Sequence, residues 1–288
     1  MSISTGDLEW RLVRGLPIFF NNIMIKQPRI EDIDKLGINY YSTMSYIFCI
    51  QKEHLPLWDT LQNEFNSKTL FQSLFVQERF YEANNKLDAS TSILILLRES
   101  LKFFLDIEDI RKIIIDVDNE RFIVIDNREF EGKIFEVPIF ELNNDNFEEF
   151  SELIRLICNL NVLEIEEEKK IKVRKYKDAS MQKRYEQLMG QLQTNEDKKK
   201  NENSITIADI IGSICTNKNT KYTLYNIDKL TIWQLFYEFN NMFTMENIDM
   251  IKSQYNSGNF QFKNPPDINW LKKVKVKLPE DNKIKKRD

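Results

Sequence analysis

Residues 231–239 read Thr-Ile-Trp-Gln-Leu-Phe-Tyr-Glu-Phe, and they predict the helix around which the C-terminal third of the chain is organised. Thr231 and Gln234 have capping-box spacing, in which each side chain can bond a backbone amide left free at the start of a helix. Apolar residues then recur at intervals of three and four, which is typical of one buried helix face. These residues are Ile232, Leu235, Phe236, Phe239 and Phe243. The pattern predicts a buried amphipathic helix and gives no evidence of a catalytic function.

The segments on either side of this helix are also predicted to be helical. Thr206 and Asp209 stand three residues apart before an apolar run through Cys215, so a capped helix is expected there. A shorter helix is expected over residues 247–255, with Gly258 as its terminator. We therefore expect a helical C-terminal unit over residues 204–288 that ends in an extended basic tail.

The N-terminal half shows two predicted hairpins between predicted helices. Residues 16–20 and 23–25 are short apolar runs around Asn21-Asn22, and residues 113–117 and 122–125 form a second pair that Asp126-Asn127 would close. A further strand is expected over residues 134–140, at a sheet edge because Pro138 cannot donate to a ladder. Helices are expected over residues 30–51, 55–65, 70–81 and 92–105, and from residue 144, where Asn144 or Asp145 would cap the helix.

Length and composition predict an α+β fold that is predominantly helical, with small antiparallel hairpins. The chain has 288 residues with only 7 Gly and 7 Pro, and so few helix breakers favour long helices. We expect an N-terminal α+β domain over residues 1–163. Charge runs over residues 164–203 predict a charged helical arm or linker, with a helix over residues 179–192.

The charge and the cysteine content of the chain limit the kinds of partner and the cellular compartment that are expected. The net charge is −4, so no global basic field attracts nucleic acid. The basic cluster at residues 169–177 follows three glutamates and is interpreted as a solvated helix face. The basic residues within 272–287 are interpreted as a solvated tail, with a docking arm for an acidic partner as the alternative. The three cysteines are far apart without a CxxC motif, and no signal peptide or membrane span is expected, so we expect a cytosolic protein.

The residue types that carry catalysis are sparse. His54 is the single histidine, and no glycine-rich phosphate loop occurs. The carboxylates around the second hairpin could in principle hold a metal ion, but hairpin turns take Asp for backbone reasons. They are Asp116, Asp118, Glu120 and Asp126. No catalytic, cofactor-binding or metal-binding residue is therefore predicted, and no cofactor.

Large apolar side chains are instead the candidates for contact with a partner protein, because aromatic anchors often dominate interface energies. The predicted partner-binding residues are Trp233, Phe236, Phe260, Phe262 and Trp270. The last three could alternatively pack back on the central helix.

Three stretches together resemble a group of proteins from tailed phages of Gram-positive hosts, encoded among tail and baseplate assembly genes. The first is Gly15-Leu-Pro-Ile-Phe-Phe-Asn-Asn-Ile-Met-Ile, which is similar to the group's N-terminal strand pair. The second runs from Asn146 to Asn161 and resembles its mid-chain helix, although residues 159–161 replace the Gln-Asn that commonly ends it. The third combines Ile205-Thr-Ile-Ala-Asp-Ile-Ile and Leu230-Thr-Ile-Trp-Gln-Leu-Phe with Ser257-Gly258 and Trp270.

This resemblance implies a role in tail morphogenesis and brings no catalytic residue with it. We expect a non-enzymatic, chaperone-like tail-assembly protein that contacts other phage tail or baseplate proteins in the host cytoplasm. One alternative is a structural subunit of the tail or baseplate retained in the virion. The other is an unrecognised enzyme with a carboxylate site. The oligomeric state stays open.

Overall fold

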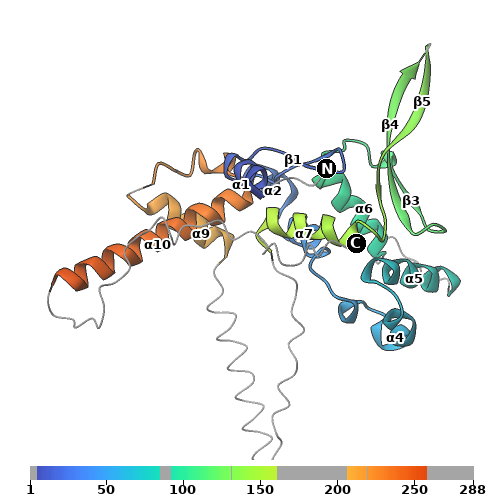
Figure 1. The fold of residues 1–288 in the computed structure, drawn as a ribbon, viewed down its shortest axis with the longest axis horizontal. Coiled ribbons are helices and arrows are strands. Elements are labelled where there is room, and N and C mark those ends of the chain that lie inside the picture. The colour runs from blue at the N-terminus through green and yellow to red at the C-terminus, as the bar shows by residue number, and fades with distance from the viewer. Residues whose placement is uncertain (1–4, 85–91, 131, 161–205, 219, 258–288) are drawn as a thin grey trace, which may run out of the picture.

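The structure is a computed structural model that describes residues 5–84, 92–130, 132–160, 206–218 and 220–257. It is α+β and predominantly helical with small antiparallel sheets, which confirms the predicted fold class (Figure 1). The helices are α1 (Thr5–Arg14), α2 (Ile30–Leu36), α3 (Ile38–Tyr46), α4 (Trp58–Asn66), α5 (Leu70–Ala83), α6 (Ile93–Phe104), α7 (Phe147–Cys158), α9 (Ile207–Thr216) and α10 (Ile232–Asn256), with short 3-10 turns η1 (Lys52–His54), η2 (Ile110–Lys112) and η3 (Ile227–Lys229). The strands are β1 (Ile18–Phe20), β2 (Ile23–Ile25), β3 (Ile113–Asp116), β4 (Arg121–Phe130) and β5 (Lys133–Leu142).

The first predicted hairpin is present as β1 and β2. Its turn residues, Asn21 and Asn22, have φ of 45° and 68°, which the two-residue turn requires and which asparagine tolerates better than most residues. Ile18 and Ile25 oppose each other and are both fully buried. The hairpin therefore turns one face to the core.

The second predicted hairpin is present as β3 and β4, and β5 extends it to a sheet in the order β3-β4-β5. The predicted turn at Asp126-Asn127 is wrong, because β4 continues to Phe130 and these two residues pair with Val137 and Glu136. The strand that contains Pro138 lies at the sheet edge, as predicted.

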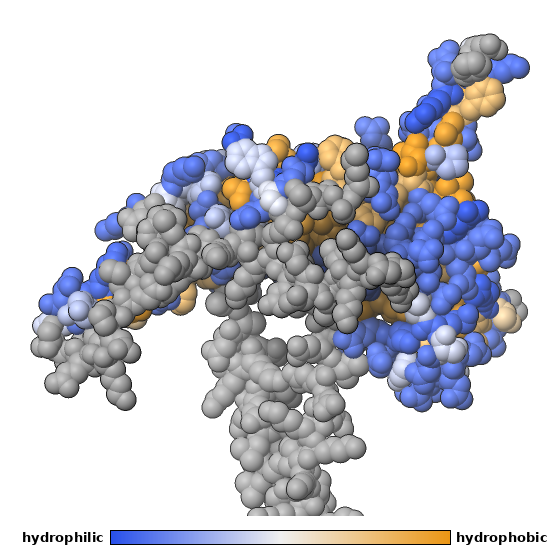
Figure 2. All heavy atoms as spheres, in the orientation of Figure 1, coloured by the Kyte–Doolittle hydropathy of each residue, from blue (hydrophilic) through white to orange (hydrophobic). Residues whose placement is uncertain are grey.

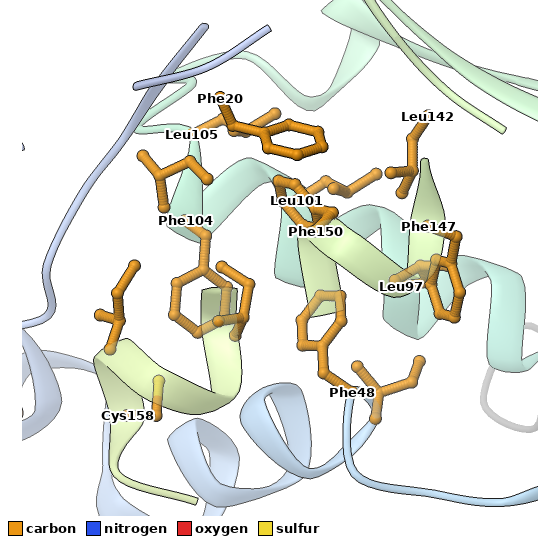
Figure 3. Close-up of a cluster of buried hydrophobic side chains, with 14 of the residues drawn as sticks. Phe20, Phe48, Leu97, Leu101, Phe104, Leu105, Leu142, Phe147, Phe150 and Cys158 are labelled. Carbon is orange, nitrogen blue, oxygen red and sulfur yellow. The ribbon is translucent and has the colours of Figure 1, made fainter. Parts of the chain in front are cut away.

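The core is rich in phenylalanine (Figure 3). Phe48 contacts the rings of Phe104 and Phe150 edge-on, with centroids 5.8 Å apart in both pairs. Phe20 from the first hairpin meets Phe150 at 5.6 Å. Edge-to-face pairs of this kind add stability beyond the area they bury. Helices α6 and α7 and the first hairpin thus meet in one aromatic cluster.

The predicted C-terminal unit packs onto the N-terminal part. The amide of Ile30 donates to the Leu230 carbonyl (3.0 Å), and the amide of Ile232 donates to the Pro28 carbonyl (2.9 Å). One cluster of buried apolar residues includes members of both parts, such as Leu12 and Leu235. The start of α10 is therefore held to the segment before α2 by main-chain hydrogen bonds and by shared packing in the core.

The capping box that opens α10 is confirmed. Thr231 Oγ1 accepts from the Gln234 amide (3.2 Å), and Gln234 Oε1 accepts from the Thr231 amide (2.9 Å). Gln234 Nε2 also donates to the Val13 carbonyl at the end of α1 (2.8 Å). Gly15 (φ +62°) lies so close that a Cβ there would sit 3.1 Å from Gln234 Nε2. Gln234 thus completes the capping box at the start of α10 and also ties that helix to the end of α1.

Four predicted boundaries are wrong. The helix expected over residues 30–51 is two helices, because Gly37 (φ 85°, ψ 135°) breaks it. Helix α4 begins at Trp58, since Pro56 keeps the preceding residue extended. The helix expected over residues 247–255 is the end of one continuous α10. Asn146, not Asn144 or Asp145, is the N-cap of α7.

Two further expectations differ from the structure. Helix α1 was not predicted, and Phe243, expected on the buried face of the central helix, is 57% exposed. The helix predicted over residues 179–192, the arm over residues 164–203 and the basic cluster at residues 169–177 lie outside the described residues, as does the basic tail. Within the described residues, no helix is long and apolar enough to cross a membrane.

Candidate interaction surfaces

Strands β4 and β5 form a ribbon that stands away from the body of the molecule (Figure 1). Strand β3 pairs only with the first four residues of β4, Arg121–Val124, so the two longer strands continue without it. Residues 127–129 and 132–136 are all exposed, and we call them the ribbon tip. The ribbon tip is thus a two-stranded element with solvent on both faces.

Two apolar side chains are displayed on the ribbon tip. Ile134 is 72% exposed and Phe135 is 48% exposed. Ile134 lies opposite Glu129 and Phe135 lies opposite Arg128, so each apolar side chain has a charged neighbour across the ribbon. Figure 2 shows apolar atoms on the ribbon interleaved with hydrophilic ones. Each face of the tip thus displays one large apolar side chain beside a charged one.

The base of the ribbon is packed against the core on one face and carries ion pairs on the other. Phe122 is fully buried, and its ring lies 5.8 Å from that of Phe75 and 6.3 Å from that of Phe71. On the opposite face, the Arg121 guanidinium bonds Asp116 (2.8 Å) and Glu141 (3.1 Å). A β-bulge between Val124 and Ile125 bends the ribbon where it leaves the body. The tip is therefore carried on an anchored base.

The distal half of α10 is a second projecting element, on the side of the molecule opposite the ribbon (Figure 1). Ile232 and Leu235 are buried near its start, whereas Phe243, Met245 and Met250 are 57%, 46% and 53% exposed. Helix α9 packs along α10, and Asn217 Nδ2 donates to Glu246 Oε1 (2.7 Å). The helix thus begins in the core and ends with several apolar side chains in water.

Three of the carboxylates around the second hairpin, Asp116, Glu120 and Asp126, lie next to cations. Asp116 accepts from Asn119 Nδ2 (2.9 Å) and from Arg121 Nε (2.8 Å), and these bonds lower the pKa of its carboxyl. Glu120 pairs with Arg79, and Asp126 lies 3.6 Å from Lys112. Within the described ranges no group of three or more His, Cys, Asp or Glu residues could hold a metal ion.

The other residues considered for chemistry have structural partners. His54 Nδ1 accepts from the Gln51 amide (3.0 Å) in the short turn η1. Burial raises the pKa of the Cys49 thiol to about 11 and that of Cys158 to about 12, so both thiols are protonated at neutral pH. Cys49 and Cys158 are free and buried, and Cys215 is free and half-buried.

The structure separates the predicted partner-binding residues. Trp233 is 6% exposed and stacks on Tyr237 with centroids 5.0 Å apart, so it lies in the core. Phe236 is half-buried against the same core. Phe260, Phe262 and Trp270 lie outside the described residues. A role for these five in partner binding stays a prediction.

Sequence reasoning missed the exposed pair Ile134 and Phe135 as interaction residues. A signal was present, because two adjacent apolar residues point to opposite faces of a strand and an isolated edge strand cannot bury both. The sequence pattern predicts a strand from residue 134, but it ends the partner strand at residue 125.

The comparison with protein families supports part of the resemblance. Residues 197–275 match the family model of the YomV second domain. This is a phage-associated family, and the match covers less than a third of the chain. It therefore supports a likeness to phage proteins without pointing to the tail or the baseplate. The searches of curated proteins and of solved structures found no match.

Proposed function

We propose that this chain is a non-enzymatic phage protein that acts through protein–protein contacts during tail assembly. In this proposal it works as a chaperone in the host cytoplasm and holds another tail or baseplate protein before that protein is built into the particle. The observation that carries the proposal is the ribbon tip, where Ile134 and Phe135 are exposed on an element with a fixed base. The match to a phage-associated family supports the part of the proposal that makes the chain a phage protein.

The size of the ribbon tip favours a reversible contact. Fully burying an isoleucine or phenylalanine side chain is worth about 1.5–3 kcal/mol. Because Ile134 and Phe135 are already partly covered, together they supply less than about 6 kcal/mol before the costs of association. A dissociation constant of about 1 mM already corresponds to about 4 kcal/mol. Permanent interfaces bury about 2,000 Å² or more. Two anchors on a ribbon suit a chaperone that must release its client better than a retained subunit.

Mass spectrometry of purified particles, from the phage that encodes the chain, tests the chaperone against the structural subunit. A chaperone is expected in the infected-cell lysate and absent from mature particles. Detection in particles at a fixed ratio to a tail protein would make the chain a virion subunit instead.

The ribbon tip is tested by Ile134→Ser combined with Phe135→Ser in the phage genome. We expect the yield of complete particles to fall at least tenfold while the melting temperature of the purified protein is unchanged. The matched control is Ile38→Ser with Tyr40→Ser on α3, because these side chains are also exposed (46% and 44%) and lie on a different element. Equal yields from both double variants would refute a role of the tip.

The enzyme alternative is tested at the carboxylates of the second hairpin. The variant combines Asp116→Asn, Asp118→Asn and Glu120→Gln. Because Asp116 and Glu120 bond arginines, circular dichroism must first establish that the variant is folded. We expect a folded variant to keep its particle yield. A folded variant without particle yield would favour a carboxylate site.

A further inference from the structure

The sheet β3-β4-β5 carries isoleucine on its outer face, where the exposed face of an antiparallel sheet usually carries polar residues. Ile114 of β3 lies directly opposite Ile123 of β4, so their side chains lie on the same face. This face points away from the core, because the next residue of β4 in each direction, Phe122 or Val124, is buried on the other face. Ile114 is 42% exposed and Ile123 is half-buried. The base of the ribbon thus displays two neighbouring isoleucines at its surface.

The same face continues to the ribbon tip. The bulge places its extra residue in β5, so side chains still alternate regularly along β4. Glu129, six residues after Ile123, therefore lies on the same face, and it is opposite the exposed Ile134. Six strand residues span about 20 Å. Hydrophobic atoms follow the ribbon from the body towards its tip (Figure 2). We call this side of the ribbon, from Ile114 and Ile123 to Ile134, the outer ribbon face.

The charged residues of the outer ribbon face are mostly acidic. Four carboxylates and one guanidinium give it a net charge of −3. They are Asp116, Arg121, Glu129, Glu136 and Glu141. The Arg121 guanidinium is already bonded to Asp116 and Glu141. Glu129 and Glu136 form no ion pair within the part of the chain that the structure describes. Negative charge without a local counter-charge therefore lies beside the exposed isoleucines.

We infer that the outer ribbon face binds a basic amphipathic segment of the partner protein. Such a segment would pack its apolar side chains on the isoleucines and place its lysine or arginine side chains beside the carboxylates. A helix of about 14 residues matches the length of about 20 Å. This inference rests on the proposed function, because it names the kind of segment that the ribbon would hold.

The charge also selects one face of the ribbon over the other. The opposite face of β4 and β5 carries Asp126, Arg128 and Lys133, for a net charge of +1. A basic segment is complementary to the outer ribbon face and is weakly repelled by this one.

Two synthetic peptides of about 14 residues test the inference with the full chain. Both have the same apolar residues at helical spacing, and the positions beside them are lysine in one peptide and glutamate in the other. Fluorescence anisotropy of the labelled peptides measures their affinities. We expect the lysine peptide to bind at least tenfold more tightly at low salt. The preference should become smaller at about 1 M salt, where the Debye length is about 3 Å.

Charge reversal on the outer ribbon face should reverse the preference. Glu129→Lys combined with Glu136→Lys changes the net charge of this face from −3 to +1, so the glutamate peptide should then bind more tightly. The matched control is Glu149→Lys with Glu152→Lys on α7, two exposed positions where the same charge change should leave the preference as it was. Ile114→Ser should weaken binding of the lysine peptide at least threefold in a protein with an unchanged circular dichroism spectrum.

Equal affinities for the two peptides, or no binding of either, would overturn the inference. A preference for lysine that survives Glu129→Lys with Glu136→Lys in a folded protein would do the same. These outcomes are distinct from those of the particle-yield experiment. A ribbon tip that is required for yield but shows no peptide preference refutes this inference alone. A clear preference with a tip that is dispensable for yield refutes the proposed function alone.

Discussion

The ribbon tip and the distal half of α10 both carry apolar side chains into water, but they do so in different ways. On the ribbon tip, Ile134 and Phe135 lie on opposite faces, and each has a charged residue across the strand pair. On α10, the exposed Phe243 and Met250 continue a stripe that is already half-buried at Phe236. The ribbon displays two separate apolar side chains, whereas the helix displays the exposed end of a row of apolar residues that begins in the core.

The largest expected effect contrasts the base of the ribbon with its tip. Phe122→Ala should lower the free energy of unfolding by about 3–5 kcal/mol, because the fully buried ring leaves a cavity beside Phe71 and Phe75. Phe135→Ala at the exposed tip should change it by less than about 0.5 kcal/mol. Urea unfolding followed by circular dichroism measures both. Equal losses would mean that the tip is not separate from the core.

The next effect contrasts the two sides of distal α10. Ile248 is 2% exposed, so Ile248→Ala should cost about 2–4 kcal/mol in urea unfolding. Met245→Ala, at a neighbouring exposed position, should cost less than about 0.5 kcal/mol. A small loss at Ile248 would show that distal α10 contributes little to the cooperative unit.

A smaller effect is expected at the capping box of α10. Thr231→Ala removes the hydroxyl that accepts from the Gln234 amide and should cost about 1 kcal/mol of unfolding free energy. Thr244→Ala in the same helix, where the hydroxyl bonds only the Asn240 carbonyl, is the control and should cost less. Thermal unfolding with matched buffers would detect the difference, and its absence would argue against the cap.

The smallest effect is electrostatic and lies at the ribbon base. The pKa of Asp116 is lowered in the fold, so its bonds stabilise the protein above the ordinary carboxyl pKa of about 4 and are lost as pH falls through the lowered value. Asp116→Asn should therefore destabilise the protein slightly at pH 7, by a few tenths of a kcal/mol, and by progressively less below about pH 4. Urea unfolding at a series of pH values measures the difference in unfolding free energy between the unaltered protein and Asp116→Asn. This difference should be smaller when both proteins also carry Arg121→Gln. A difference that grows on acidification would contradict the assignment.

Local signals predicted most of the fold. The capping boxes at Thr206 and Thr231 and the Asn21-Asn22 turn depend on neighbouring residues, and the structure confirms them. The length of the ribbon was missed because Asp126-Asn127 has turn-forming chemistry, while the strand pair instead closes at Gly132 (φ 72°). Phe243 follows the correct helical period, but how far a neighbouring surface extends along a helix is not a local property. The exposure of Phe243 was missed for that reason.

The backbone bridge between residues 28–30 and 230–232 has a consequence for biosynthesis. These segments are about 200 positions apart, and ribosomes add about 5–20 residues per second, so the first segment leaves the ribosome about 10–40 seconds before its partner. Throughout that interval Leu12 and the other N-terminal members of the buried cluster lack Leu230, Ile232 and Leu235 as packing partners. Synonymous codon changes that slow translation before residue 230 should increase the fraction of nascent chains bound by ribosome-associated chaperones. Changes that speed translation there should reduce this fraction.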